Sequence, residues 1–349
     1  MSGALEEVRA AIGDAGGLLR FDEYVRLALY GEHGFYNAGG RAGRRGGHFL
    51  TSPEVGPLFG AVLARAIDGW WHRLGEPGDF AIVEAGAGPG TLARAILAAE
   101  PECAPRYVTV EVSAAQRAEH PADVEALAGL TSLPAGVTGV VVANELLDNL
   151  PFRLAVHDGG WREAYVADGG DGTLREVLAA PLDPLPAWLP ASASHGARAP
   201  IQDEAAAWVR AALGTLDRGR VLAVDYAVAR TAELTLRPWR EWLRTFRGHD
   251  RGGHYLADPG TQDVTVEVCL DQLPPPDAVR TQHQFLALHG IDELVEAGRA
   301  EWAKAAAAPS LRALMMRSRI REAEALTDPD GLGGFLAVEW EVPSGHDDR

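Results

Sequence analysis

The chain of 349 residues alternates segments with the hydrophobic period of a helix and short, continuous apolar runs. Helical spacing predicts helices over residues 4–28, 57–74, 91–99, 202–216 and 311–326. Apolar or alternating runs predict strands over residues 80–85, 107–112, 139–143, 220–224 and 334–342. Because these strands alternate with helices, the pattern predicts a parallel, doubly wound α/β sheet.

Two further regions are less regular. Residues 153–157 and 161–166 flank an Asp-Gly-Gly turn at 158–160 and predict a β-hairpin. Residues 168–199 are rich in Pro, Ala and Gly without a sustained period, which predicts a loop or an insertion.

Composition and charge exclude several classes of protein. With 32 Lys and Arg residues against 49 Asp and Glu residues, the formal net charge is -17, which disfavours binding to nucleic acid or anionic membranes. Lys304 is the only lysine, so the chain has no P-loop. The preference for arginine over lysine is typical of a GC-rich bacterial genome. Cys103 and Cys269 stand apart, so no zinc site is predicted. Without a signal-peptide pattern or an apolar span, we expect a cytoplasmic protein with buried thiols.

One predicted strand runs directly into three closely spaced glycines, Gly86, Gly88 and Gly90, and then into a helix start. Glycine lets a ligand approach the backbone at the first turn of a doubly wound sheet. The dinucleotide fingerprint G-x-G-x-x-G does not fit, because the third glycine comes one position early. With Glu84 ahead of them, the glycines are similar to the first motif of class I S-adenosyl-L-methionine-dependent methyltransferases. Glu111 ends the next strand, where a carboxylate can accept both ribose hydroxyls.

Further short strings spread over residues 20–295 strengthen this pattern. They are Ala28-Leu29-Tyr30, Gly34-Phe35-Tyr36, Phe49-x-Thr51-Ser52-Pro53-Glu54, Glu111-Val112-Ser113, Asn144-Glu145-x-x-Asp148-x-Leu150-Pro151, Asp225-Tyr226, Pro259-Gly260-x-Gln262-Asp263-x-Thr265 and Gln284-Phe285-Leu286. In combination they resemble the MidA-like methyltransferases, a family that includes the mitochondrial complex I assembly-factor arginine methyltransferase.

The resemblance implies an α/β fold of the class I methyltransferase type, with a Rossmann-like doubly wound sheet and S-adenosyl-L-methionine as cofactor. In the mitochondrial branch it also implies methylation of arginine on a protein subunit. We accordingly divide the chain into an N-terminal helical extension with a cofactor-covering loop at residues 1–75 and a methyltransferase domain at 76–349. The domain carries an insertion near 151–200 and an acceptor-side loop region near 231–270.

The acceptor side needs residues that position a nucleophile, because methyl transfer from a sulfonium is an in-line displacement. A planar guanidinium is held best by paired carboxylates. Glu145 and Asp148 follow a predicted strand, and their spacing would place them on one helical face. We assign them to catalysis together with Asn144, which could instead contact the amino-acid end of the cofactor. The alternative is an ordinary helix start, with Asn as N-cap and acidic residues in the first turn.

The remaining candidates follow from the glycine motif and the family strings. Cofactor contacts are predicted for Thr51, Ser52, Pro53, Glu84, Gly86, Gly88, Gly90, Glu111 and Asn144. Substrate contacts are predicted for Glu54, Asp225, Gln262 and Asp263. Each has a plainer alternative, because Ser-Pro-Glu also begins helices and acidic strand ends and Pro-Gly turns are common. The histidines lack metal-ligand spacing, so no metal is predicted.

The leading hypothesis is a methyltransferase that acts on arginine nitrogen of a protein, with a respiratory complex I subunit as one candidate partner. A small-molecule methyltransferase shares every cofactor feature. A cofactor-binding assembly factor without catalysis is a third hypothesis, since His48, Asn149, Ala227 and His283 depart from the family pattern. A nicotinamide-dependent reductase is disfavoured by the position of Gly90.

Overall fold

The largest sheet of the molecule carries the predicted parallel strands. The computed structural model describes residues 3–39, 51–129, 133–248, 250–305 and 310–343. Across the seven-stranded sheet the order is β16 (Ala278–Thr281), β17 (Leu336–Val342), β10 (Leu216–Asp225), β5 (Val137–Asn144), β2 (Ala81–Ala85), β3 (Arg106–Glu111) and β4 (Glu125–Ala128). Strands β10, β5, β2, β3 and β4 run parallel, and β17 is antiparallel to both of its neighbours. The predicted doubly wound sheet is confirmed.

Both faces of this sheet are buried. In β5, Val140 and Val142 pack into one core, whereas Val141 packs into the other. The strand is therefore a continuous apolar run in the sequence instead of an alternating one.

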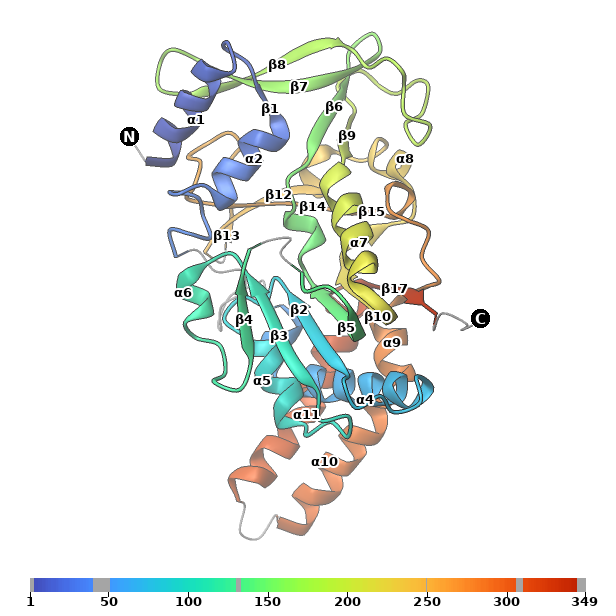
Figure 1. Cartoon of the computed structure of the whole chain (residues 1–349). Coiled ribbons are helices and arrows are strands. Elements are labelled where there is room, and N and C mark those ends of the chain that lie inside the picture. The colour runs from blue at the N-terminus through green and yellow to red at the C-terminus, as the bar shows by residue number, and fades with distance from the viewer. Residues whose placement is uncertain (1–2, 40–50, 130–132, 249, 306–309, 344–349) are drawn as a thin grey trace.

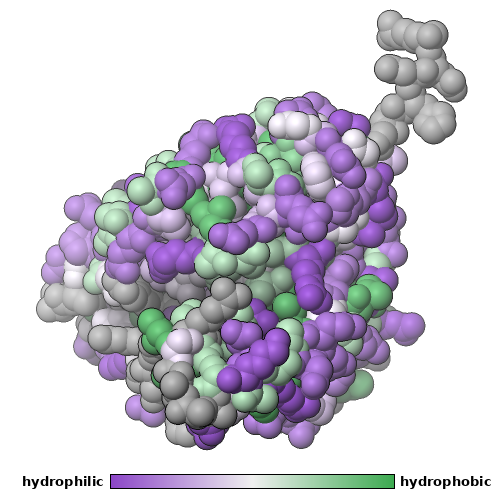
Figure 2. Space-filling view, turned by 90° about the horizontal axis from the view of Figure 1, so that it is seen from below, coloured by the Kyte–Doolittle hydropathy of each residue, from purple (hydrophilic) through white to green (hydrophobic). Residues whose placement is uncertain are grey.

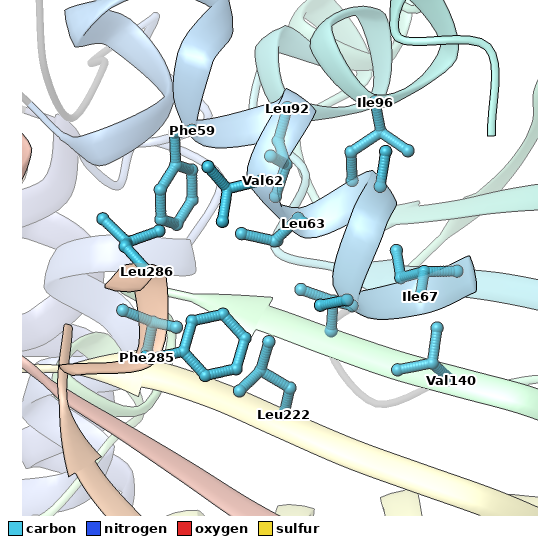
Figure 3. Packing of buried hydrophobic residues seen from close by; sticks show 14 of the residues in the cluster. Phe59, Val62, Leu63, Ile67, Leu92, Ile96, Val140, Leu222, Phe285 and Leu286 are labelled. Atoms are coloured by element: carbon cyan, nitrogen blue, oxygen red, sulfur yellow. The ribbon is translucent and has the colours of Figure 1, made fainter. Parts of the chain in front are cut away.

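Helices from distant parts of the chain cover the two faces. The first core receives α4 (Pro57–Arg73), α5 (Thr91–Ala98), α9 (Gln282–Leu288), α10 (Ile291–Ala305) and α11 (Leu311–Thr327). The second receives α7 (Asp203–Thr215). Figure 3 shows the first core, where Phe59 of α4 and Phe285 of α9 point toward Leu222 of β10, and all three side chains are fully buried. Burial of each such side chain stabilises the fold by about 1.5–3 kcal/mol.

Two glycines let the central strands approach each other where they begin. Gly139 of β5 lies between Ala81 of β2 and Gly219 of β10 in the sheet register. A Cβ on Gly139 would lie 1.9 Å from the Ala81 carbonyl oxygen, and one on Gly219 would lie 1.9 Å from the Gly139 oxygen. Both glycines also have positive φ, 154° and 138°, which other residues rarely adopt. These positions therefore require glycine.

A second layer of small sheets lies over the carboxyl ends of the parallel strands (Figure 1). The larger sheet has the order β1 (Leu19–Arg20), β7 (Trp161–Asp168), β6 (Arg153–His157) and β9 (Arg198–Ile201), with β8 (Leu174–Pro181) also paired to β7. The smaller ones are β13 (Asp250–Arg251), β12 (Leu243–Arg247) and β14 (Asp263–Val266), and the pair β11 (Ala227–Val228) and β15 (Val268–Cys269). These sheets share a core with α1 (Gly3–Asp14) and α2 (Phe21–Tyr30). The N-terminal helices thus pack onto residues that lie more than a hundred positions later in the chain.

Short helical turns complete the connections. They are α3 (Ser52–Val55), α6 (Ala114–Arg117), α8 (Thr231–Leu234), and the 3₁₀ turns η1 (Leu147–Asn149), η2 (Trp239–Glu241), η3 (Leu270–Gln272) and η4 (Leu332–Gly334).

Two sequence predictions of local structure need correction. The single helix predicted over residues 4–28 was wrong, because Gly16 and Gly17 adopt positive φ and end α1 before the chain continues as β1 and α2. The irregular segment predicted over 168–199 was wrong in part, because β8 forms within it and β9 begins at its end. The hairpin is confirmed as β6 and β7. The division at residues 75 and 76 stays a prediction.

The surface is mainly hydrophilic on the face seen from below (Figure 2), where hydrophobic residues appear as separate spots. Across the described ranges, no helix combines the length and the apolar character that a bilayer crossing requires.

Candidate cofactor and acceptor site

A pocket opens at the carboxyl ends of β2, β3 and β5, where a doubly wound sheet places its ligands. It encloses about 880 Å³ with its open mouth included, a size typical of small-molecule sites. The sequence-predicted residues that line it are Thr51, Pro53, Glu54, Glu84, Gly86, Gly88, Glu111, Asn144 and Glu145. The predicted residues that do not line it are Ser52, Gly90, Asp148, Asp225, Gln262 and Asp263. Tyr30 and Tyr36 of the N-terminal segment form part of its wall.

The glycine turn forms the floor of the pocket between β2 and α5. Gly86, Gly88 and Gly90 have φ of 66°, 53° and 76°, a left-handed conformation that favours glycine at each position. The Gly86 N–H donates to the Val110 carbonyl at 2.9 Å, which ties the turn to β3. A Cβ on Gly86 would lie 2.9 Å from Leu146 Cδ1, so a side chain there would press into the wall of the site.

Glu111 ends β3 beside this turn. Its carboxylate accepts the Gly88 N–H at 2.9 Å and the Ser113 N–H at 2.8 Å. Burial raises its pKa above the ordinary value. Each carboxylate oxygen has two lone pairs, so the group can still accept hydrogen bonds from a ligand in the pocket.

Glu84 lies at the base of the pocket and is also buried. The Tyr107 hydroxyl of β3 donates to its Oε2 at 2.6 Å. Burial raises the Glu84 pKa to about 7 despite this hydrogen bond. Tyr107 therefore fixes the orientation of the Glu84 carboxyl group.

Glu145 follows β5 directly, but it does not lie on a helix. Its φ is 51°, and its N–H donates to the Val224 carbonyl of β10 at 2.8 Å. The helical turn η1 begins only at Leu147, so the predicted shared helical face with Asp148 was wrong. The left-handed conformation places Glu145 on the pocket wall, whereas Asp148 lies behind it.

The Glu145 carboxyl group is buried among polar neighbours. Its Oε1 accepts hydrogen bonds from Asn144 Nδ2 at 3.1 Å and from the Ser52 N–H at 3.4 Å. Burial, together with the nearby charges of Asp148 and Glu54, raises the Glu145 pKa to about 8. Ser52 itself is fixed elsewhere, because its hydroxyl donates to Gln282 Oε1 at 2.8 Å.

Asp148 and Asp225 form a buried pair behind the wall. Tyr226 donates its hydroxyl to Asp148 Oδ2, and burial raises the Asp148 pKa to about 7. Asp225 Oδ2 accepts the N–H groups of Leu147 at 3.0 Å and Asp148 at 3.2 Å, and its Oδ1 accepts the Tyr226 N–H at 3.0 Å. Asp225 therefore holds the start of η1 in place, and its predicted contact with a substrate stays a prediction.

Gln262 shapes a loop instead of facing the pocket. Its Nε2 donates to the carbonyls of His254 and Ala257, both at 2.9 Å, and its Oε1 accepts the Gly253 N–H at 3.0 Å. These contacts fix the loop before β14. The substrate contact predicted for Gln262 stays a prediction.

Asp263 joins β14 to the N-terminal wall of the pocket. Its carboxylate is approached by the Tyr36 hydroxyl at 3.2 Å and Asn149 Nδ2 at 3.0 Å. Asn149 Oδ1 also lies 3.1 Å from the Tyr36 hydroxyl, and its backbone carbonyl accepts the Tyr30 hydroxyl at 3.2 Å. Burial raises the Asp263 pKa to about 6. Sequence reasoning identified Asn149 only as a departure from the family pattern, and no sequence period indicated this role.

Two of the other departures, Ala227 and His283, lie away from the pocket lining. Ala227 pairs with Val268 between β11 and β15, and His283 Nδ1 lies 3.0 Å from the Thr327 carbonyl oxygen. His48 lies outside the described residues.

Three buried oxygens around the site have no hydrogen-bond partner among the described residues: Glu54 Oε2, Asn144 Oδ1 and Asp148 Oδ1. Glu54, Glu145 and Asp148 also form no ion pair with another described residue. Buried carboxylates are usually paired, because an isolated charge loses its hydration. The site is therefore suited to a ligand that carries positive charge and hydrogen-bond donors.

Comparison with known proteins decides the family. Residues 62–289 match the family described as "Putative S-adenosyl-L-methionine-dependent methyltransferase". The chain belongs to this family. A crystal structure of a Burkholderia thailandensis protein bound to S-adenosyl-homocysteine is similar to this methyltransferase-family chain with a TM-score of 0.80. The two are 26% identical, with 97% of this chain and 92% of that chain covered. The predicted class I methyltransferase fold is confirmed.

Curated relatives match a smaller share of the chain. The "Protein arginine methyltransferase NDUFAF7 homolog, mitochondrial" of Drosophila melanogaster is 27% identical over 286 residues, which cover 70% of this chain and 63% of the relative. The mitochondrial protein arginine methyltransferase NDUFAF7 of Mus musculus is 26% identical over 291 residues, covering 72% and 64%. The family chain thus spans just under two thirds of the length of these two relatives.

The residues present in this methyltransferase-family chain fit S-adenosyl-L-methionine. The glycine turn leaves space that a Cβ at Gly86 would restrict, and Glu111 retains acceptor capacity for ribose hydroxyls. Asn144 Oδ1 is a buried acceptor without a described partner, which suits a ligand ammonium group. No phosphate-binding lysine is needed, because this cofactor has no phosphate.

Proposed function

We propose that this chain is a protein N-methyltransferase that acts on the guanidinium group of an arginine side chain. The observation that carries the proposal is the pair of half-buried acidic residues on the pocket wall, Glu54 and Glu145, which have no ion-pair partner among the described residues. When bound, S-adenosyl-L-methionine supplies a methyl group on a sulfonium for attack by a nucleophilic nitrogen.

The wall carboxylates match the shape and charge of a guanidinium. This group is planar, always charged near neutral pH, and offers its donors in a fork that fits carboxylates. Glu54 Oε2 is buried without a partner, and the charge of Glu54 acts on Glu145, so the two groups lie near each other. We therefore propose Glu54 and Glu145 as the guanidinium-binding pair in place of Glu145 and Asp148, because Asp148 does not line the pocket. Two carboxylates compensate the charge of a guanidinium as it leaves water.

The raised pKa values also suit the proton that a guanidinium nitrogen must lose when it is methylated. A carboxylate with an ordinary pKa near 4 is a weak proton acceptor at neutral pH. Burial raises the Glu145 pKa to about 8 and the Asp148 pKa to about 7. A bound guanidinium would favour the ionised form of Glu145, as a nearby positive charge does for any carboxyl group. We assign this ionised Glu145 as the group that takes the proton, with Asp148 behind it raising its proton affinity.

The names of the curated relatives support a protein as substrate, since both relatives are called protein arginine methyltransferases. A subunit of respiratory complex I, the partner that the family resemblance implies, is one candidate. We propose it as the first to be tested.

The test uses the purified chain with S-adenosyl-L-methionine carrying a labelled methyl group and a cell extract as the source of acceptors. We expect label in a protein band, recovered as methylarginine after hydrolysis. Glu54→Gln is expected to reduce this incorporation by about 10- to 150-fold while cofactor binding persists, since it removes a hydrogen bond to a charged group worth about 1.5–3 kcal/mol. Glu76→Gln is the control, because Glu76 is exposed and lies outside the pocket lining.

The outcomes separate the competing functions. Label confined to small molecules would contradict the proposal in favour of a small-molecule methyltransferase. Cofactor binding without any incorporation would contradict it in favour of a non-catalytic factor. Label on lysine or on a carboxyl group would retain methyl transfer and refute the guanidinium assignment.

A further inference from the structure

Gly88 is held through both of the peptide groups that flank it. Its N–H donates to Glu111 Oε2 at 2.9 Å, and its carbonyl oxygen lies 2.7 Å from His120 Nε2. His120 does not line the pocket, so any effect it has on a ligand passes through Gly88.

The contacts of His120 define which nitrogen carries the proton. A carbonyl oxygen can only accept, so Nε2 must carry a hydrogen and donate to Gly88. In the neutral ring Nδ1 is then an acceptor, and the buried Thr109 hydroxyl of β3 lies 2.9 Å away to donate to it. Burial lowers the His120 pKa, which favours this neutral form. The Gly88 carbonyl, which can only accept, therefore selects this tautomer. The Thr109 hydroxyl, which also lies 3.4 Å from the Glu125 carbonyl oxygen, can donate to the remaining ring nitrogen.

The imidazole ring also explains why the third position of the motif is glycine. A Cβ on Gly90 would lie 3.1 Å from His120 Cδ2 and 3.2 Å from Pro121 Cδ. The segment is anchored from the other side, because Arg94 Nη1 of α5 donates to the Glu119 carbonyl at 2.9 Å. His120 thus fills the space beside the turn and cannot shift without moving it.

We infer that His120 is a positioning residue for the cofactor, through a hydrogen-bonded chain from Thr109 to His120 to Gly88 to Glu111. His120 holds the Gly88–Pro89 peptide group through its carbonyl, and Glu111 holds the Ala87–Gly88 peptide group through its N–H. Together they fix φ and ψ of Gly88, so the Gly88 N–H stays directed at Glu111. Glu111 in turn stays oriented toward the ribose hydroxyls of S-adenosyl-L-methionine. This role is independent of which acceptor is methylated, so it goes beyond the proposed function and does not depend on it.

The test measures the Kd of S-adenosyl-homocysteine by calorimetry on the full chain, with circular dichroism and thermal melting as checks of folding. In His120→Ala the Gly88 carbonyl loses its partner, and we expect Kd to rise about tenfold. In His120→Gln the side-chain amide can donate to the same carbonyl, and we expect Kd within about threefold of the parent. Thr109→Val keeps the side-chain volume but removes the hydroxyl beside His120 Nδ1, so an increase of about threefold is expected. His283→Ala is the matched control, because His283 is exposed and contacts a carbonyl outside the site.

Two results would overturn the inference. An unchanged Kd in folded His120→Ala would show that the contact has no effect on the cofactor. Equal weakening in His120→Ala and His120→Gln would show that ring packing against Gly90, not the hydrogen bond, is responsible. If His120→Ala does not fold, Thr109→Val decides, and an unchanged Kd in that variant overturns the inference.

Discussion

Replacing Glu111 by glutamine separates the two tasks of this carboxylate with almost no change in volume. The parent group accepts two backbone N–H groups, from Gly88 at 2.9 Å and Ser113 at 2.8 Å. A glutamine side chain has one acceptor oxygen, so its NH₂ group must face one of these donors. The N–H that loses its acceptor costs about 1–3 kcal/mol, and this cost lowers the free energy of unfolding of the ligand-free protein.

The same replacement also weakens cofactor binding, and this effect is measured separately as an increase in Kd. A hydrogen bond from a ribose hydroxyl to a charged acceptor is worth about 1.5–3 kcal/mol, which corresponds to an increase in Kd of about 10- to 150-fold. Calorimetric titration with S-adenosyl-homocysteine measures this Kd, and urea unfolding of the ligand-free protein measures stability. Glu125→Gln is the control, because Glu125 lies on the neighbouring strand, exposed and paired with Arg106. A Kd for Glu111→Gln within about twofold of the parent would refute the assignment of Glu111 to the ribose.

Two further predictions concern stability. Burial raises the pKa of Glu145 to about 8 and of Asp148 to about 7, so the folded state binds their protons more tightly than the unfolded state does. Their contribution to stability is fully present below about pH 4 and is lost as the pH rises through 7 to 8. The melting temperature of the ligand-free protein should therefore fall over this pH range, and it should fall less steeply in Glu145→Gln. Equal slopes in the two proteins would contradict the raised pKa of Glu145. Gly139→Ala would place a Cβ 1.9 Å from the Ala81 carbonyl oxygen, so we expect a loss above about 4 kcal/mol and little soluble protein, while Gly13→Ala, with open space around it, expresses normally.

The part of the site that sequence predicts best is the part built from strand ends. Gly86 directly follows the buried apolar strand β2, and Glu111 is the last residue of the buried strand β3. The carboxyl ends of parallel strands meet at one edge of a sheet, irrespective of the conformations of the loops. The acceptor side depends on single backbone conformations instead. Nothing in the sequence indicated that Glu145 adopts a left-handed φ of 51°, and that angle decides which carboxylate lies on the wall.

The second layer shows a different limit of sequence reasoning. Strand β1 has only two residues, which is too short for a hydrophobic period to show. Its partner β7 starts at Trp161, so no turn residues next to β1 indicate the pairing either. Residues 4–28 satisfy a helical period because α1 and α2 both bury a face against the same core. His120 carries no local signal either, since its importance arises from a carbonyl contact 32 positions away in sequence.

The pairing of β1 with β7 also determines the order in which the protein can be completed during synthesis. The N-terminal wall of the pocket contains Tyr36, whose hydroxyl lies within hydrogen-bond distance of Asp263, a residue made more than two hundred positions later. Contacts between such distant positions form late, because closing a long loop costs entropy before the contact can repay it. The glycine turn between β2 and α5 therefore exists in the growing chain well before the wall that completes the pocket. In a growing chain, α1 and α2 are made before the sheet of β7 and β6 that they pack against. Because the pocket wall is completed only after that sheet forms, we expect cofactor binding to be among the last properties that this protein acquires.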